Sequence, residues 1–319
     1  MRIVRQLGEG KPEPAVVAVG NFDGVHRAHQ AILGAVRAEA RQRGAMAVAV
    51  TFDPHPSRVL RPQQAPPLIT PGNEKIRRLA ATGMDEVVLL PFSRDLSLLT
   101  PLEFVEQILV RGLHAVAVHE GHNFRFGQRH AGTTADLQRF GAEFGFDVRV
   151  HPPMLLRGQA ISSSAVRDAI AAGNLRRARH LLGRVFSLVG AIAPGRGIGR
   201  QRTVPTLNLQ HYEELLPAAG VYLTRVGVAG ATYNALTNVG VRPTFGEHGP
   251  LTVESHLLAP PPEGLSAGLG DTMEIAFLAR CRDERRFDTP DALRAQILRD
   301  IAWAQRYFAL ADHKRIMVG

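Results

Sequence analysis

Short apolar runs alternate with amphipathic stretches through the N-terminal half of the chain. The apolar runs, which are typical of buried strands, cover residues 15–20, 46–52, 85–92, 114–120 and 146–152. Between them, apolar residues recur at helical spacing over residues 29–44, 72–83, 100–112 and 133–145. This alternation predicts an α/β domain with a doubly wound, Rossmann-like parallel sheet that carries helices on both faces.

After residue 182 the pattern changes to β-rich runs separated by glycine and proline turns. Six runs cover residues 185–193, 204–210, 220–228, 232–240, 251–258 and 272–279. Strands without intervening helices predict a closed six-stranded antiparallel β-barrel, because closure removes exposed sheet edges. A final helix is expected to pack on the barrel through an apolar stripe of Leu293, Ile297, Ile301 and Phe308. We therefore expect two domains, residues 1–182 and 183–319.

Two of the predicted helices carry their own start signals. Thr100 as N-cap, Pro101 at the first helical position and Glu103 at the third form a capping box. Thr289 and Pro290 occupy the corresponding positions before the final helix. These residues fix where the two helices should begin.

Composition agrees with a folded protein of two domains. The chain has 319 residues, of which 45% are hydrophobic and 21% charged, so a disordered chain is disfavoured. No apolar run approaches the ~20 residues of a membrane span, and the opening residues lack the apolar core of a signal peptide. We expect a cytoplasmic protein with no membrane partner. The single cysteine, Cys281, excludes an internal disulfide and a multi-cysteine zinc site.

The net charge of +9 raises the question of an anionic partner. Nearly all the cations are arginines, and they are spread along the chain. The densest group, residues 174–184, alternates with apolar residues as the solvated face of a short helix does. No nucleic-acid reading motif accompanies the charge, so we expect no nucleic-acid partner. A basic nucleic-acid-binding protein without catalysis stays the alternative from another class, and its affinity would fall steeply with salt.

The most informative motif follows the first of these strands, where residues 19–30 read VGNFDGVHRAHQ. Gly20 and Gly24 permit a tight turn, and His26 and His29 can face the same way at a helix start. Two imidazoles beside a helix N-terminus suit phosphate binding during phosphoryl or nucleotidyl transfer. The pair alone also fits exposed helix histidines or metal ligands.

A second glycine-rich stretch, GRGIGR, covers residues 195–200. It is not a dinucleotide fingerprint, because β-like residues follow it instead of a helix. None of the lysines completes a Walker A loop. The stretch is either a flap whose backbone N–H groups cover phosphates or a plain turn.

Several stretches, taken in order, resemble one family. They are GNFDGVHRAH, TFDPHP, residues 68–92, EGHNFRFG and ISSSAVR. They are similar to the nucleotidyltransferase superfamily and, within it, to bacterial bifunctional riboflavin kinase/FAD synthetases. The resemblance implies that residues 1–182 are an FMN adenylyltransferase domain, which uses ATP to convert FMN to FAD and releases pyrophosphate. It further implies that His26 and His29 contact the ATP phosphates and support the transition state.

The same resemblance implies the other ligand contacts of this half. ATP and its phosphates would be bound by Gly20, Phe22, Asp23, Gly24, Ser163, Ser164 and Arg167. Hydroxyl groups and an arginine fork at a helix start suit that task. Asn123 and Phe124 would position flavin or metal.

The C-terminal half resembles the kinase module of the same family. The resembling stretches are GRGIGRQRTVPTLNL, GVY, NVGVRPTF, VESHLL and CRDERRF. The resemblance implies that this riboflavin kinase domain phosphorylates riboflavin to FMN. Thr206 and Asn208 would hold Mg²⁺ and ATP phosphates, and Glu254 would be the base that takes the proton of the ribityl 5′-hydroxyl. Gly195, Gly197 and Gly199 would form the flap over the phosphates.

The expected cofactor is Mg²⁺, with ATP as co-substrate, riboflavin and FMN as substrates, and FMN and FAD as products. Several positions depart from the family pattern. Ala28 replaces the glycine between the histidines, and we expect it to weaken adenylyl transfer without abolishing it. Thr203, Leu207 and residues 257–270 alter the flap and the flavin contacts. A monofunctional kinase and a nucleotidyltransferase for another anionic acceptor therefore stay open as alternatives. The sequence gives no signal for the oligomeric state.

Overall fold

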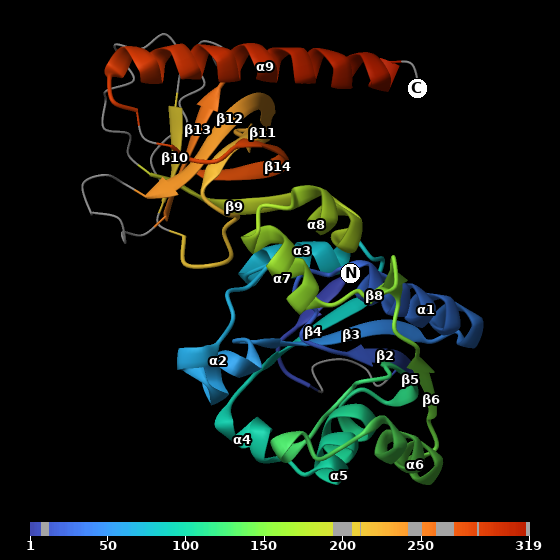
Figure 1. The fold of residues 1–319 in the computed structure, drawn as a ribbon. Helices are drawn as coiled ribbons and strands as arrows, with labels where there is room; N and C mark the ends of the chain where they lie inside the picture. Colours follow the sequence, from blue (N-terminus) through green and yellow to red (C-terminus); the bar gives the residue numbers. More distant parts are fainter. Residues whose placement is uncertain are drawn as a thin grey trace. The chain divides into compact units, whose positions relative to one another are not determined.

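The computed structural model describes residues 1–7, 13–193, 206–210, 212–241, 251–259, 271–285 and 287–316, with residues 312–316 described by backbone alone. The chain forms two compact units, Met1–Ala165 and Val166–Gly319. Figure 1 draws the N-terminal unit from blue to green and the C-terminal unit from green to red. The expected functional boundary at residue 183 stays a prediction.

A parallel sheet forms the centre of the N-terminal unit. Its strands are β1 (Arg2–Val4), β2 (Ala15–Val19), β3 (Met46–Asp53), β4 (Glu86–Pro91), β5 (Ala115–Gly121) and β6 (Asp147–His151). They lie in the order β1-β4-β3-β2-β5-β6, and every neighbouring pair is parallel. The five strands expected from the apolar runs are confirmed. The short edge strand β1 was not predicted; Arg2 ties it to β4 through Glu86, with 2.5 Å between Nε and Oε2.

Helices cover both faces of this sheet, as the alternating pattern predicts (Figure 1). The helices of the unit and of the segment after it are α1 (Arg27–Arg43), α2 (Pro56–Leu60), η1 (Pro62–Gln64), α3 (Gly72–Ala80), α4 (Arg94–Leu98), α5 (Pro101–Phe104), the π-helix η2 (Val105–Gly112), η3 (Gln128–His130), α6 (Thr134–Phe144), α7 (Ser163–Ala171) and α8 (Leu175–Leu182). Helices α1 and α3 pack on one face through Leu33, Val36 and Leu79, while α5, η2 and α6 bury aromatic and aliphatic residues on the other. A hairpin of β7 (Leu155–Leu156) and β8 (Gln159–Ala160) precedes α7.

The predicted capping box is present at the start of α5. The Thr100 hydroxyl accepts from the Glu103 N–H at 3.2 Å, and the Glu103 carboxylate accepts from the Thr100 N–H at 2.8 Å. The arginine-rich stretch forms α8, which buries Leu175, Leu181 and Leu182. Its arginines therefore belong to an amphipathic helix, as expected from their spacing.

The order of the strands reverses between β2 and β5. After β2 the chain turns by way of α1 to β3 on one side, whereas β5 pairs with the other side of β2. Ligands of doubly wound sheets bind at the carboxyl ends of strands where the order reverses in this way. The segment after Val19 and the segment after Gly121 both leave the sheet at this place.

The C-terminal unit contains a closed antiparallel barrel in the order β10-β13-β12-β11-β14-β9. Its strands are β9 (Phe186–Ala193), β10 (Thr206–Leu209), β11 (Gly220–Val228), β12 (Ala231–Val241), β13 (Leu251–Leu257) and β14 (Thr272–Arg282). Tyr222, Leu188 and Phe277 are among the side chains that are fully buried in this unit. The predicted six-stranded barrel is confirmed.

Helix α9 (Pro290–Ile316) packs on the outside of the barrel (Figure 1). The Thr289 hydroxyl caps it by accepting from the Ala292 N–H at 3.2 Å. Ala304 and Phe308 pack against Leu223 and Leu236, which β11 and β12 turn outward. Within the described residues, no helix has the length and apolarity needed to cross a membrane.

Candidate functional site

The loop after β2 has a strained backbone. Gly24 has φ 86°, but Phe22 and Val25 also adopt positive φ, at 46° and 39°. A positive φ is unfavourable for bulky residues and above all for a β-branched one. Such strain persists only where the surrounding structure holds it, and it concentrates at functional sites.

Two distant segments hold this loop in place. The buried Asp23 carboxylate accepts N–H groups of Ile69 and Thr70, with 2.9 and 3.0 Å to Oδ1. The Thr70 hydroxyl accepts from the Gly24 N–H at 2.8 Å. From the other side, the Ser163 hydroxyl donates to the Asp23 carbonyl oxygen at 2.8 Å. Asp23 and Ser163, both predicted to bind ATP, are thus joined through the loop that they support.

Replacing Thr70 with valine should loosen this loop. The variant keeps the shape of the side chain but leaves the buried Gly24 N–H without its acceptor, which costs about 1–3 kcal/mol. We expect a lower melting temperature and a higher KM for ATP in FMN adenylylation, with riboflavin phosphorylation unchanged. Differential scanning calorimetry gives the melting temperature, and separate assays of the two reactions give the KM for ATP and the rate of riboflavin phosphorylation. An unchanged KM for ATP would contradict the role of the loop in nucleotide binding.

His26 and His29 form a stacked pair at the start of α1, with 3.6 Å between ring centroids. The Nδ1 atom of His26 accepts from the His29 N–H at 3.4 Å, so a neutral His26 carries its proton on Nε2. Burial, reinforced by the neighbouring His26, lowers the pKa of His29 well below its ordinary value. His29 is therefore neutral at pH 7, and its Nδ1 is buried without a hydrogen-bond partner among the described residues. Phe22 packs edge-on against His29, with 5.2 Å between the ring centroids.

The other predicted residues of this half lie at three places. Gly20 follows β2 and donates its N–H to the Val50 carbonyl at 2.9 Å. Asn123 is exposed directly after β5, and Phe124 is half-buried and stacks on Phe126 at 5.5 Å. The remaining two, Ser164 and Arg167, lie on α7 with Ser163. Their binding roles stay predictions.

Glu120, at the end of β5, is a buried acid that the sequence did not single out. Its side chain is fully buried, and Oε1 accepts from the Val19 N–H at 2.7 Å. Burial raises the pKa of Glu120 well above its ordinary value, so the carboxyl keeps its proton to a higher pH in the folded protein than in the unfolded chain. It links the ends of β2 and β5, the two strands between which the order reverses.

The Glu120→Gln variant is expected to be more stable than the wild type at neutral and alkaline pH. The unfolded chain loses the Glu120 proton near pH 4.5, whereas the folded chain keeps it to a higher pH. Wild-type stability therefore falls by about 1.4 kcal/mol per pH unit between the two pKa values. Glutamine keeps a side-chain oxygen that accepts from the Val19 N–H, and because it does not titrate, it does not lose stability as the pH rises. Urea unfolding of wild type and Glu120→Gln between pH 5 and 8 tests this, with Glu143→Gln at an exposed position as the control. The prediction is contradicted if the difference in the free energy of unfolding between the two proteins does not grow with pH.

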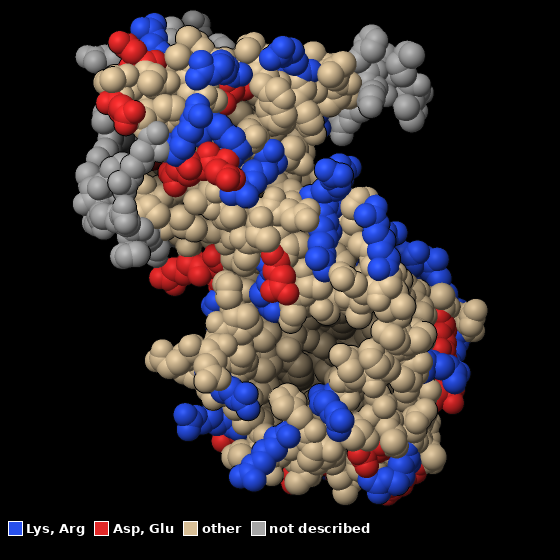
Figure 2. All heavy atoms as spheres, in the orientation of Figure 1, with Lys and Arg blue, Asp and Glu red and all other residues tan. Residues whose placement is uncertain are grey.

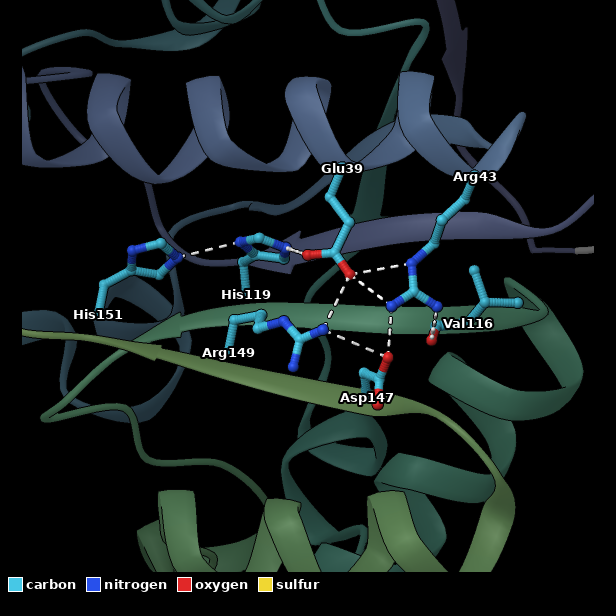
Figure 3. A network of polar contacts seen from close by, with 7 residues as sticks. All are labelled: Glu39, Arg43, Val116, His119, Asp147, Arg149 and His151. Atoms are coloured by element: carbon cyan, nitrogen blue, oxygen red, sulfur yellow. Dashed lines mark hydrogen bonds and ion pairs between the residues drawn. The ribbon is translucent and has the colours of Figure 1, made fainter.

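A polar network ties α1 to β5 and β6 (Figure 3). His119 is buried, and it lies 2.8 Å from Glu39 Oε2 through Nε2 and 3.0 Å from His151 Nε2 through Nδ1. Burial lowers the pKa of His119, so a neutral ring donates to Glu39 and accepts from His151. The His151 carbonyl accepts the His122 N–H at 2.9 Å. The network thus supports the segment that leads to Asn123.

The predicted kinase residues meet on the outer face of the barrel. Asn208 of β10 lies directly opposite Glu254 of β13, and Thr206 opposite His256. Residues 253, 255 and 257 point inward and are buried, so residues 254 and 256 point outward. Inside, the hydroxyl of Ser255 lies 2.9 Å from that of Thr237, its paired residue on β12. Gly195, Gly197 and Gly199, as well as Thr203, lie outside the described residues.

Two residues on this face were not identified from the sequence. Asn238 of β12 lies opposite Glu254 on the side away from Asn208, so two amides flank the carboxylate. His256 places Nδ1 3.3 Å from the Thr206 hydroxyl. Both belong to stretches that carry the family resemblance, but only the register of the strands brings them to the site. Among the described residues, no cluster of three or more histidine, cysteine or acidic side chains could hold a metal.

The surface charge agrees with small anionic ligands. In Figure 2, lysine and arginine side chains are scattered over the visible face of the N-terminal unit, which also has a hollow bordered mainly by other residues. They form no continuous basic stripe on this face, the feature that tracks a nucleic-acid backbone.

Comparison with known proteins matches the two halves of the chain to two different families. The FAD synthetase family matches residues 9–165, and the riboflavin kinase family matches residues 182–308. A bifunctional riboflavin kinase/FMN adenylyltransferase of Pseudomonas fluorescens is 36% identical and covers 98% of this chain and 100% of its own length. The enzyme of that name from Escherichia coli K12 is 34% identical, covering 97% of this chain and 98% of its own.

A solved structure from Streptococcus pneumoniae, described as a macrolide-efflux protein, is also similar. It has a TM-score of 0.84 and 29% identity, covering 96% of this chain and 99% of its own. Its fold thus matches both units. Two successive family matches and full-length relatives above 30% identity place this chain in the family of bifunctional riboflavin kinase/FMN adenylyltransferases.

Proposed function

We propose that this protein phosphorylates riboflavin to FMN in its C-terminal half and adenylylates FMN to FAD, with release of pyrophosphate, in its N-terminal half. ATP is the second substrate of both reactions. The observation that carries this proposal is the placement of Glu254 between Asn208 and Asn238 in a chain that also holds the His26–His29 pair at a strand end. One chain thus has a candidate site for each reaction named in its relatives.

In the N-terminal half, the strained loop and the start of α1 receive the ATP phosphates. His26 donates from Nε2, and the neutral His29 adds a second imidazole beside the helix N-terminus. These groups stabilise negative charge on the α-phosphoryl group as the FMN phosphate attacks it and pyrophosphate leaves. Asp23 and Gly24 act by shaping the loop, and Ser163, Ser164 and Arg167 bind the leaving pyrophosphate. Asn123 and Phe124 position the flavin.

In the C-terminal half, Glu254 accepts the proton of the ribityl 5′-hydroxyl while that oxygen attacks the γ-phosphoryl group of ATP. Thr206 and Asn208 offer a hydroxyl and an amide oxygen on the same face, and hard oxygen donors of this kind fit Mg²⁺. When bound, Mg²⁺ would neutralise charge on the ATP phosphates. It commonly keeps several waters and shares substrate oxygens, so two protein ligands suffice.

The two activities are assigned to residues 1–182 and 183–319. The family matches end at residue 165 and begin at residue 182, which leaves most of α7 and α8 between them. Riboflavin, FMN and ATP are the proposed ligands, and nucleic acid is not among them. The absence of a gel shift with nucleic acid at low salt would support the latter point.

The direct test is incubation of purified protein with riboflavin, ATP and Mg²⁺, followed by chromatographic separation of riboflavin, FMN and FAD. We expect FMN to appear first and FAD to accumulate after it. A reaction that stops at FMN, also when FMN is supplied directly, would favour the monofunctional kinase, for which Ala28 is the motivating feature. Untouched riboflavin, with reduced flavin tested as well, would overturn the proposal.

A further inference from the structure

The outer face of the barrel continues beyond Glu254. On β12, Asn238 is followed two residues later by Gly240, and both point to the same side of the strand. The carboxylate of Glu284 fills the space that a side chain at Gly240 would take. A Cβ built there would lie 2.0 Å from Oε1 and 2.7 Å from Oε2 of Glu284. Glu284 therefore lies on the same face as Glu254.

The segment that carries Glu284 is anchored on both sides. Before it, Arg282 donates to Asp300 Oδ2 on α9, from Nε at 3.0 Å and from Nη2 at 2.8 Å. After it, Arg285 hydrogen-bonds to Gln296 on the same helix. These contacts tie residues 282 and 285 to α9. They hold Glu284 against the strand although its side chain is exposed.

Three polar side chains on this face keep their hydrogen-bonding capacity for a ligand. Within the described part of the chain, the carboxylates of Glu254 and Glu284 and the amide of Asn238 have neither a hydrogen bond nor an ion pair. Glu254 and Asn238 are half-buried, where polar groups are normally satisfied. A bound molecule with several hydroxyl groups would satisfy all three.

The register of the strands gives the direction in which such a molecule extends. On β13, His256 pairs with Thr206, whereas Thr252 pairs with Gly240. The proposed phosphate end at Thr206 and the Gly240 end therefore lie on opposite sides of Glu254. An acceptor whose terminal hydroxyl is at Glu254 extends its remaining chain toward Gly240. The missing side chain there makes room for the Glu284 carboxylate, which therefore lies at the end toward which that chain extends.

We propose that Asn238 and Glu284 bind the inner hydroxyl groups of the polyol chain of the phosphoryl acceptor. This inference rests on the proposed kinase reaction. The Glu284 carboxylate accepts O–H donors in charge-assisted hydrogen bonds, and the Asn238 amide both donates and accepts. Both residues select a flavin whose side chain carries these hydroxyl groups, and Glu254 alone takes the proton.

The test compares two acceptors for the kinase reaction of the full chain. One is riboflavin, and the other is the same flavin with a 5-hydroxypentyl chain, which keeps only the terminal hydroxyl. Wild type should prefer riboflavin in kcat/KM. Glu284→Gln should reduce that preference about tenfold, the value of one hydrogen bond to a charged group. The loss should lie in the KM for riboflavin, with the hydroxypentyl flavin unaffected.

Two further variants complete the test. Asp283→Asn removes the same charge from the neighbouring residue, whose side chain is 84% exposed and contacts Arg280, and should keep the wild-type preference. Gly240→Ala should reproduce the loss, because its Cβ displaces the Glu284 carboxylate. An unchanged preference in Glu284→Gln, or equal losses for both acceptors, overturns the inference. Failure of wild type to phosphorylate riboflavin would instead overturn the proposed function.

Discussion

The Glu254→Gln variant is expected to lose riboflavin phosphorylation by about 10²–10⁴-fold in kcat, the usual contribution of a general base. Glutamine has nearly the same shape but cannot take the proton of the attacking hydroxyl. Glu254 has no hydrogen bond within the described residues, so the substitution breaks no structural contact there. The melting temperature and the KM for ATP should therefore change little.

The full chain supplies an internal control for this result. FMN adenylylation, measured with FMN supplied directly, should keep its wild-type rate in Glu254→Gln. Glu274→Gln offers a matched glutamate on the same barrel, where the carboxylate bonds the Ser187 hydroxyl at 2.8 Å. It should retain kinase activity. Kinase activity within threefold of wild type in Glu254→Gln would assign the proton transfer to another group or to solvent.

The regular elements were predictable because their burial follows a simple period. Strands β2 to β5 and helices α1 and α6 repeat apolar residues at spacings that the sequence displays directly. The barrel strands were found in the same way, although the sequence did not give their order of pairing. Strand β1 was missed because three residues are too few to show a period.

The sites were predictable only as far as local motifs carry them. The resemblance named His26, His29 and Glu254, but the loop strain at Val25 has no local signal, since valine normally avoids positive φ. Contacts between distant residues were missed for the same reason. Asn238 joins Glu254 only through the strand register, and His119 meets Glu39 across 80 positions in the chain.

The two roles of His26 can be separated by the choice of substitution. His26 is both the N-cap of α1 and a proposed donor to phosphate. Asparagine is a good N-cap, so His26→Asn removes the imidazole while it keeps an acceptor for the His29 N–H. We expect this variant to lose FMN adenylylation by about 10²–10³-fold, the cost of one donor to developing charge. Riboflavin phosphorylation and the melting temperature should stay near wild type.

His26→Ala completes this comparison, because it removes both the imidazole and the cap. It should lose adenylylation to a similar degree and also about 1 kcal/mol of stability. If His26→Asn restored the melting temperature and the adenylylation rate together, His26 would act only by starting α1. If the rate stayed low at a wild-type melting temperature, the imidazole itself would act on the phosphates. The stacked geometry then implies that His29, the neutral partner whose ring centroid lies 3.6 Å away, shares that task, because the two rings lie side by side at the start of α1.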